Sequence, residues 1–229
     1  MKPIIWTGYG SPDVLQLRDV EAPIPKENEV LIRIHAATAS TPDSELRRLK
    51  LPLFFAIALR LYLGLIRPTR VTIPGSEFAG EIVSTGKEVK IYRQGDQVYG
   101  YTGLTMGTYA EYLCLPEDVS GMAGVFAQKP DNISYEEAAS IPFGGLEALH
   151  TLRKANIQPG QKVLIIGAGG SIGAYSVQLA KYHGAEVTGV DKPNKFEMLR
   201  SIGADHVIDY SQEDFTRKGE KYDVILDTI

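Results

Sequence analysis

The chain has 229 residues, of which 44% are hydrophobic and 23% charged, and its formal net charge is −4. This length accommodates two modest domains or one large one, and the composition is that of a soluble globular protein. The acidic balance argues against nucleic acid and against an anionic membrane as the main partner. The single cysteine excludes internal disulfides and a multi-thiolate zinc site. It suits a cytoplasmic location, as does the lack of a signal-peptide pattern in residues 1–8.

The first 124 residues are predicted to form a β-barrel-like domain. Short runs rich in β-formers, separated by Gly and Pro turns, predict strands at 1–9, 15–21, 29–37, 75–84, 95–99 and 108–115. A helix is expected over 40–50, with Ser40 or Thr41 as its cap, Pro42 in its first turn and Glu45 in a capping-box position. Many short strands joined by such turns are typical of a compact barrel.

Residues 51–66, LPLFFAIALRLYLGLI, form the most apolar stretch of the chain. The stretch is shorter than the roughly 20 residues that span a bilayer, and Arg60 lies in its middle. We therefore expect one or two short helices whose apolar faces need covering. Two interpretations remain open. The segment lines or covers a substrate site, which would imply an apolar substrate, or it forms a core or subunit contact.

Beyond residue 124 the pattern changes to alternating helices and buried strands. Helices or helical turns are predicted at 134–139, 142–155, 194–202 and 212–216, the first of them with Ser134 as cap and Glu137 as third residue. Apolar runs predict parallel strands at 163–166, 186–190, 206–209 and 223–227. A doubly wound sheet typically has six strands, so this one is incomplete. The fold class is α/β, with domains over 1–124 and 125–229.

Residues 162–191, KVLIIGAGGSIGAYSVQLAKYHGAEVTGVD, carry the strongest functional signal. Strand, glycine turn, helix, strand and acid follow one another as in a nucleotide-binding βαβ unit. The spacing is G-x-G-G-x-x-G, so the strict G-x-G-x-x-G is absent, although G-x-x-G-x-x-G fits. Glycines allow the tight turn and let a pyrophosphate approach the helix N-terminus. The alternative is an ordinary strand-to-helix turn. The residues expected at the nucleotide are Gly167, Gly169, Gly170, Ser171, Ile172 and Gly173.

Asp191 ends the second strand of this unit, 18 residues after Gly173. A carboxylate there accepts hydrogen bonds from the adenosine ribose and repels the 2′-phosphate of NADP, which favours NAD. Lys192 and Lys195 have the opposite effect, because either is long enough to reach that phosphate. We expect NAD or NADP as the cofactor, with NAD favoured. The alternative is that Asp191 is a solvated acid at a strand end.

Four further stretches accompany the glycine motif, namely PGSEFAGEIVSTGKEVKIYRQGDQVYG (74–100), MGTYAEYLCLP (106–116), YEEAASIPFGGLEALHTL (135–152) and RSIGADHVIDY (200–210). In this order they resemble the medium-chain dehydrogenase/reductase family, and within it the zinc-free, quinone-oxidoreductase-like branch, over nearly the entire chain. The resemblance implies a GroES-like β-barrel domain followed by a Rossmann domain. It also implies an enzyme that transfers hydride between NAD(P) and a small carbonyl, enone or quinone substrate.

The resemblance also implies site residues. Gly144 and Gly145 lie where the family passes its backbone close to the nicotinamide. Hydroxyls and backbone N–H groups must steady the substrate oxygen if no metal does so. The candidates for this role, on loops that the family directs at the reaction site, are Ser40, Asp43 and Thr102. Each also has a structural interpretation as a helix cap or a surface group.

Two departures from the family pattern bear on metal binding and on length. Zinc-dependent members have a histidine where this chain has Ser76 and a cysteine near 40–43, so no zinc is expected. The family's chain also runs on beyond four strands, so we expect a C-terminally truncated form: a natural fragment, a truncated gene product or a deliberately shortened chain. The rival function is therefore a non-catalytic nucleotide-binding fragment. An unpaired edge strand at 223–227 would favour a homo-oligomer.

Overall fold

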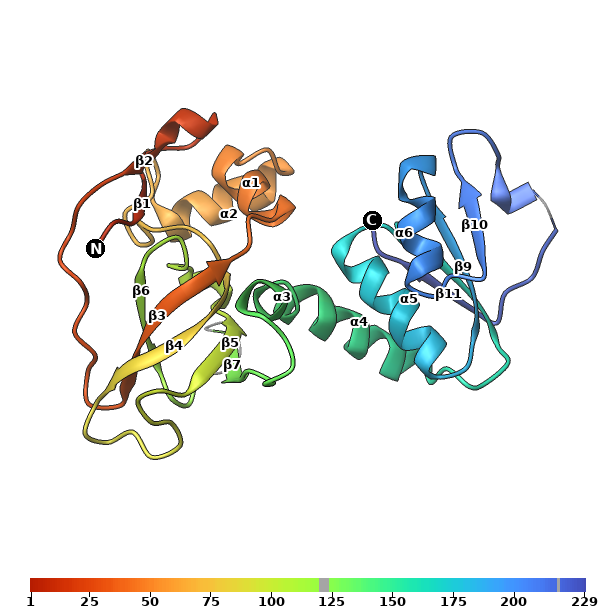
Figure 1. The fold of residues 1–229 in the computed structure, drawn as a ribbon. Coiled ribbons are helices and arrows are strands. Elements are labelled where there is room, and N and C mark those ends of the chain that lie inside the picture. The colour runs from red at the N-terminus through yellow and green to blue at the C-terminus, as the bar shows by residue number, and fades with distance from the viewer. Residues whose placement is uncertain (120–123, 218) are drawn as a thin grey trace. The chain divides into compact units, whose positions relative to one another are not determined.

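The computed structural model describes residues 1–119, 124–217 and 219–229. These residues form two compact units, Met1–Pro142 and Phe143–Ile229 (Figure 1). The units divide later in the chain than the predicted boundary at 124/125. The reason is that Val125–Gln128 forms strand β7, which pairs with β5 (Gln97–Tyr101) in the sheet of the first unit.

Among the described residues of the first unit, five strands form an antiparallel sheet in the order β6-β3-β4-β5-β7. Its other strands are β3 (Glu29–Ala37), β4 (Glu77–Thr85) and β6 (Tyr112–Pro116). The side chains of Val30, Ile32 and Phe78 are fully buried on one face. The register between β3 and β4 shifts at two points, as β-bulges do, and bulges bend a sheet. This curled sheet is the expected β-barrel-like domain.

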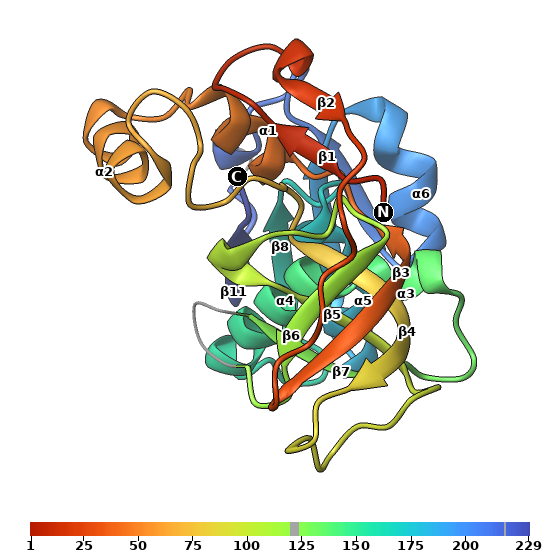
Figure 2. The same ribbon diagram turned by 90° about the vertical axis from the view of Figure 1, so that its left-hand side faces the viewer.

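The remaining elements of the first unit lie around this sheet (Figures 1 and 2). The predicted strands over 1–9 and 15–21 are present only as a two-stranded sheet of β1 (Ile4–Trp6) and β2 (Leu15–Leu17). The helices and 3-10 helices are η1 (Pro12–Val14), α1 (Thr41–Arg48), α2 (Leu53–Leu63), η2 (Gly103–Thr105) and α3 (Tyr135–Ala139). Helix α3 begins with the predicted capping box of Ser134 and Glu137.

The apolar stretch 51–66 forms the single helix α2 rather than a pair of helices. Leu63 is the buried residue of this helix and packs in a cluster with Trp6, Val71 and Met106. The expected covering of its other apolar residues is absent, because Leu53, Phe54 and Leu61 are 77%, 78% and 69% exposed. No helix among the described residues is long and apolar enough to cross a membrane.

The second unit contains the expected parallel sheet. Its order is β10-β9-β8-β11, which corresponds to the 3-2-1-4 half of a doubly wound sheet. The strands are β8 (Lys162–Ile166), β9 (Glu186–Asp191), β10 (His206–Asp209) and β11 (Val224–Asp227), each within a residue or two of its prediction. The helices and 3-10 helices are α4 (Pro142–Ala155), α5 (Ser171–Tyr182), η4 (Pro193–Lys195), α6 (Phe196–Ser201) and η5 (Phe215–Arg217).

Helices α4 and α5 supply part of the core of this unit. Leu152 of α4 and Val177 of α5 belong to one buried cluster with Val163, Ile165 and Val187 of the sheet. Strands β8 and β9 are buried on both faces and have nearly continuous apolar sequences, which is why they were predictable from the sequence. The packing fixes the carboxyl ends of β8 and β9 beside the first turn of α5, where the glycine motif lies.

Candidate functional site

The glycine motif forms a closed turn between β8 and α5 in the second unit. Gly167 has a φ of +75°, a conformation that favours glycine. The N–H groups of Gly167 and Ala168 both donate to the carbonyl of Val190 in β9, at 3.1 and 3.2 Å. A Cβ on Gly173 would lie 2.3 Å from the Gly167 oxygen, so the first turn of α5 packs directly on backbone.

The N-terminus of α5 is left without a side-chain cap. Its N-cap residue is Gly170, and no acidic residue lies in the first turn. The N–H groups and the positive dipole end of a helix of this length favour a phosphate group. Gly144 of α4 lies against this first turn, because a Cβ there would be 2.2 Å from the Ser171 hydroxyl. Gly145 follows Gly144 on α4.

Asp191 is held against the glycine turn by two backbone amides. Its Oδ2 accepts from the Gly169 N–H at 2.7 Å, and its Oδ1 accepts from the Lys192 N–H at 2.7 Å. A Cβ on Gly169 would lie 2.8 Å both from that Oδ2 and from Cγ of Lys195. The structure thus brings together the acid, both lysines and the turn that the sequence assigned to one nucleotide site.

Thr228 is a residue of this region that the sequence analysis missed. Its hydroxyl donates to the carbonyls of Ile166, at 2.8 Å, and Gly167, at 3.2 Å. It follows β11, which is the neighbour of β8 in the sheet. A polar residue directly after an apolar parallel strand was the available signal. The backbone cradle, the uncapped helix and the fixed acid fit a dinucleotide. The side chains next to the turn are those of Thr228 and Ile229 at Gly167 and those of Asp191 and Lys195 at Gly169.

In the first unit, Ser40 and Asp43 form the capping box of α1. The Asp43 carboxylate accepts from the Ser40 N–H at 2.8 Å and from the Ser40 hydroxyl at 2.6 Å, while the Asp43 N–H donates to that hydroxyl at 3.4 Å. The expectation that Glu45 occupies the capping-box position was wrong. Ser40 is the N-cap, and the third residue counted from it is Asp43. Both candidates therefore stabilise the start of a helix.

Tyr109 is the partner of Asp43 that the sequence did not reveal. It precedes β6 rather than lying within a strand, and its ring packs against Gly75, where a Cβ would be 2.3 Å from Cδ1. Burial raises the pKa of the Tyr109 phenol far above its ordinary value. The negative charge of Asp43 and a hydrogen bond with its carboxylate add to this shift in the pKa. Tyr109 therefore stays a neutral hydrogen-bond donor at physiological pH.

Asp43 also lines a cavity of about 240 Å³ in the first unit. Glu45, Ser76 and Tyr101 are further polar lining residues, and the apolar ones include Leu46, Leu51, Leu59, Leu104 and Met106. Thr102, the third catalytic candidate, is fully buried. Its N–H and hydroxyl donate to the Ser76 carbonyl at 2.7 and 3.2 Å. The structure therefore places Asp43 at the cavity and uses Thr102 to hold the backbone of a lining residue.

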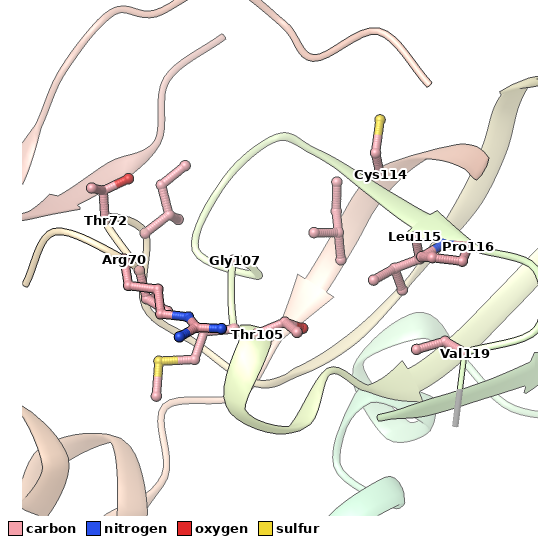
Figure 3. Close-up of a pocket in the computed structure, with 12 residues that line it drawn as sticks. Arg70, Thr72, Thr105, Gly107, Cys114, Leu115, Pro116 and Val119 are labelled. Atoms are coloured by element: carbon pink, nitrogen blue, oxygen red, sulfur yellow. The ribbon is translucent and has the colours of Figure 1, made fainter. Parts of the chain in front are cut away.

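A second cavity of about 370 Å³ in the same unit contains Cys114 (Figure 3). Figure 3 shows Cys114, Leu115 and Pro116 on one side, with Arg70 and Thr72 on the other. Burial raises the pKa of the Cys114 thiol to about 11, and the nearby charge of Glu29 acts in the same direction. The thiol is therefore protonated at neutral pH, and it is a poor nucleophile there.

We expect Cys114 of the folded chain to react with iodoacetamide at pH 8 about 100-fold more slowly than Cys114 of the urea-unfolded chain. The thiolate is the reactive form, and a pKa near 11 leaves little of it at pH 8. The rate should rise about tenfold per pH unit until the pH approaches that pKa. Mass spectrometry of timed samples measures both rates. Equal rates for folded and unfolded chain would contradict this prediction.

Few side chains of the protein are arranged to bind a metal ion. Among the described residues, no group of three or more His, Cys, Asp or Glu side chains is arranged to hold a metal ion. The nearest approach between a histidine and an acid is the surface pair of His206 and Glu186, at 3.1 Å. Ser76 lines the 240 Å³ cavity.

A curled antiparallel sheet followed by a glycine-turn βαβ sheet defines a two-domain dehydrogenase-type fold with a dinucleotide cradle. Comparison with known proteins supports this class. Residues 26–128 match the model of the alcohol dehydrogenase GroES-like domain, and residues 171–229 match the model called zinc-binding dehydrogenase. A quinone oxidoreductase structure from Coxiella burnetii is 32% identical, with a TM-score of 0.85 over 99% of this chain and 68% of its own.

Two curated relatives match the whole chain. One is 2-methylene-furan-3-one reductase of Solanum lycopersicum, 34% identical, and the other is a chloroplastic NADPH-dependent alkenal/one oxidoreductase of Arabidopsis thaliana, 32% identical. The chain spans 57% of the length of each. It belongs to the medium-chain dehydrogenase/reductase family, in the quinone-oxidoreductase-like branch. The expected family and fold class are thus confirmed.

Proposed function

We propose that the protein is a zinc-independent NAD(P)H-dependent oxidoreductase acting on quinones, enones or other small carbonyl compounds. The observation that carries this proposal is the nucleotide cradle, in which Asp191 is fixed against the glycine turn and α5 begins without a side-chain cap. The substrate class is supported by the names of the relatives, which include a furanone reductase, an alkenal/one oxidoreductase and a quinone oxidoreductase.

The residues of the second unit would bind and orient the nucleotide. When bound, the nicotinamide supplies or accepts the hydride. The first turn of α5 would hold the pyrophosphate, and Asp191 would accept hydrogen bonds from the ribose while its own orientation is fixed by the Gly169 and Lys192 amides. Gly144 and Gly145 keep the start of α4 free of side chains next to that turn.

The residues of the first unit would orient the substrate. The 240 Å³ cavity is mostly apolar, and Leu51 and Leu59 come from the apolar stretch 51–66. This supports the interpretation in which that stretch lines the substrate site and selects an apolar substrate. Asp43 places a charge at the cavity and holds the hydroxyls of Ser40 and Tyr109. Ser40 remains the candidate for steadying the substrate oxygen, a role in which its hydroxyl proton would have to turn from the Asp43 carboxylate to the substrate.

Zinc independence is supported by the residues available. Ser76 replaces the family's zinc-ligating histidine, and the described residues provide no cluster of three metal-ligating side chains. Preference for NADH is supported by the carboxylate of Asp191 at the ribose position. The NADPH dependence named for the Arabidopsis relative makes this preference a direct subject for experiment.

The test combines binding and turnover on the same sample. We expect NADH or NADPH to bind in calorimetric titration and to be oxidised with members of a panel of quinones, enones and aldehydes, unchanged after treatment with a chelator. Asp43→Ala should lower kcat/KM about tenfold or more while the dissociation constant of the nucleotide stays unchanged, because the residue lies in the first unit. Loss of activity on chelation would refute zinc independence. Binding without turnover would favour the rival, a non-catalytic nucleotide-binding protein.

A further inference from the structure

Helix α2 and the residues that follow it expose an unusual amount of apolar side chain. Phe54 is 78% exposed and Leu61 is 69% exposed on the helix, and Ile66 beyond its end is 89% exposed. Figure 2 shows α2 on the outside of the first unit, next to α1. Large contiguous apolar surfaces on soluble domains mark interaction sites. We name residues 48–70 the α2 face.

The charge of the α2 face is opposite to that of the protein as a whole. The formal net charge of the chain is −4, yet the sequence between Glu45 and Glu77 contains no acidic residue. The same stretch contains the basic residues Arg47, Arg48, Lys50, Arg60, Arg67 and Arg70, all of which except Arg47 are exposed. Within the described part of the chain, none of these five exposed cations is in a salt bridge with a carboxylate.

The cations flank the apolar helix in the way that suits a lipid headgroup layer. Lys50 precedes the helix, Arg67 follows it, and Arg60 on the helix donates from its guanidinium to the Leu65 carbonyl at 2.7 Å. An apolar helix face with basic residues around it inserts at the headgroup boundary, and each cation near an anionic surface adds to the attraction. Helix α2 is too short to span a bilayer and long enough to lie in its surface.

We propose that the α2 face docks the protein on an anionic phospholipid surface. A second copy of the chain fits less well, because a two-fold contact through this face would bring cations without a salt bridge against the same cations of the partner. Arg60 and Arg70 lie over the rings of Tyr9 and Tyr62 and keep their charge there. The acidic net charge predicted no membrane partner. The α2 face differs because its cations are concentrated on one segment, and electrostatic attraction to a surface acts over about 10 Å rather than over the whole molecule.

The test is co-sedimentation of the full chain with lipid vesicles. We expect binding to vesicles of phosphatidylcholine with about 30% phosphatidylserine, weak binding to phosphatidylcholine alone, and weakening as NaCl rises from about 50 to 500 mM. Phe54→Glu with Leu61→Glu should weaken binding about 30-fold or more, because both side chains would leave the apolar layer. Ile24→Glu with Ile91→Glu is the matched control, since these side chains are 87% and 66% exposed and lie outside the α2 face, and this variant should bind like the unmodified chain.

Two double variants test the contribution of the cations to vesicle binding. Lys50→Gln with Arg67→Gln should weaken binding about tenfold, whereas Arg153→Gln with Lys154→Gln, the same change in net charge on exposed residues of α4, should not. Light scattering of each variant without lipid measures self-association. The proposal is overturned if the unmodified chain does not bind anionic vesicles at low salt. It is also overturned if the chain is a dimer that Phe54→Glu with Leu61→Glu separates while vesicle binding is unaffected.

Discussion

Replacing Gly173 with alanine is expected to abolish nucleotide binding and to destabilise the second unit by about 3 kcal/mol. The added Cβ would lie 2.3 Å from the carbonyl oxygen of Gly167 and 2.6 Å from Cα of Ala168. Both neighbours are backbone atoms, and Ala168 is itself held to Val190 by its N–H. The clash can be relieved only by moving α5 away from the glycine turn, which separates the helix N-terminus from the N–H groups of the cradle.

Gly170→Ala is the matched control for this prediction. Its backbone has a φ of −80° and a ψ of 173°, which alanine adopts readily, and the new Cβ would meet the Gly167 oxygen at 3.3 Å. Thermal melting should show a midpoint about 10 °C or more lower for Gly173→Ala and little change for Gly170→Ala. Calorimetric titration with NADH and NADPH measures binding. A Gly173→Ala protein that melts and binds like the unmodified chain would contradict the packing described for α5.

The parallel sheet and the nucleotide cradle were predictable because their signals are local. The strands of the second unit are apolar on both faces, so each is visible as a continuous run such as 163–166. The glycines, the helix and Asp191 follow within 30 residues of sequence. A βαβ unit has a right-handed connection between its strands, so the glycine turn after the first strand and the acid at the end of the second strand meet at the same edge of the sheet.

The contacts of the first unit were not predictable in the same way. Tyr109 and Asp43 meet although 65 residues separate them, and no sequence period connects a loop before β6 with the first turn of α1. Strand β7 was not predicted for the same reason, since its pairing with β5 is not local in the sequence. The exposure of α2 reverses the usual inference that an apolar run is buried, and only the structure could show it.

Asp191→Asn is expected to shift the preference between NADH and NADPH, measured as the ratio of their kcat/KM values, about 30-fold toward NADPH. The carboxylate lies at the glycine turn, where the ribose of a bound nucleotide would be recognised. The Asp191 carboxylate would repel the 2′-phosphate of NADPH. At a separation of about 5 Å and an effective dielectric constant near 20, this repulsion weakens binding by on the order of 3 kcal/mol for each unit of phosphate charge, and by less where water screens it. Asparagine keeps an oxygen that can accept from the Gly169 N–H, so the bond to the glycine turn should remain, whereas its NH2 group cannot replace the oxygen that accepts from the Lys192 N–H.

Removing a lysine charge at this turn is expected to shift the nucleotide preference in the opposite direction, toward NADH. The Cγ of Lys195 packs against the position of a Cβ on Gly169, and the backbone N–H of Lys192 donates to Asp191, so both lysine side chains start at the same turn. Lys195→Gln should weaken NADPH binding several-fold while leaving NADH binding unchanged, because only NADPH carries the 2′-phosphate. Titration of each variant with both nucleotides separates binding from turnover. If Asp191→Asn leaves the ratio within about threefold of the unmodified chain, Asp191 supports the glycine turn and does not select the nucleotide.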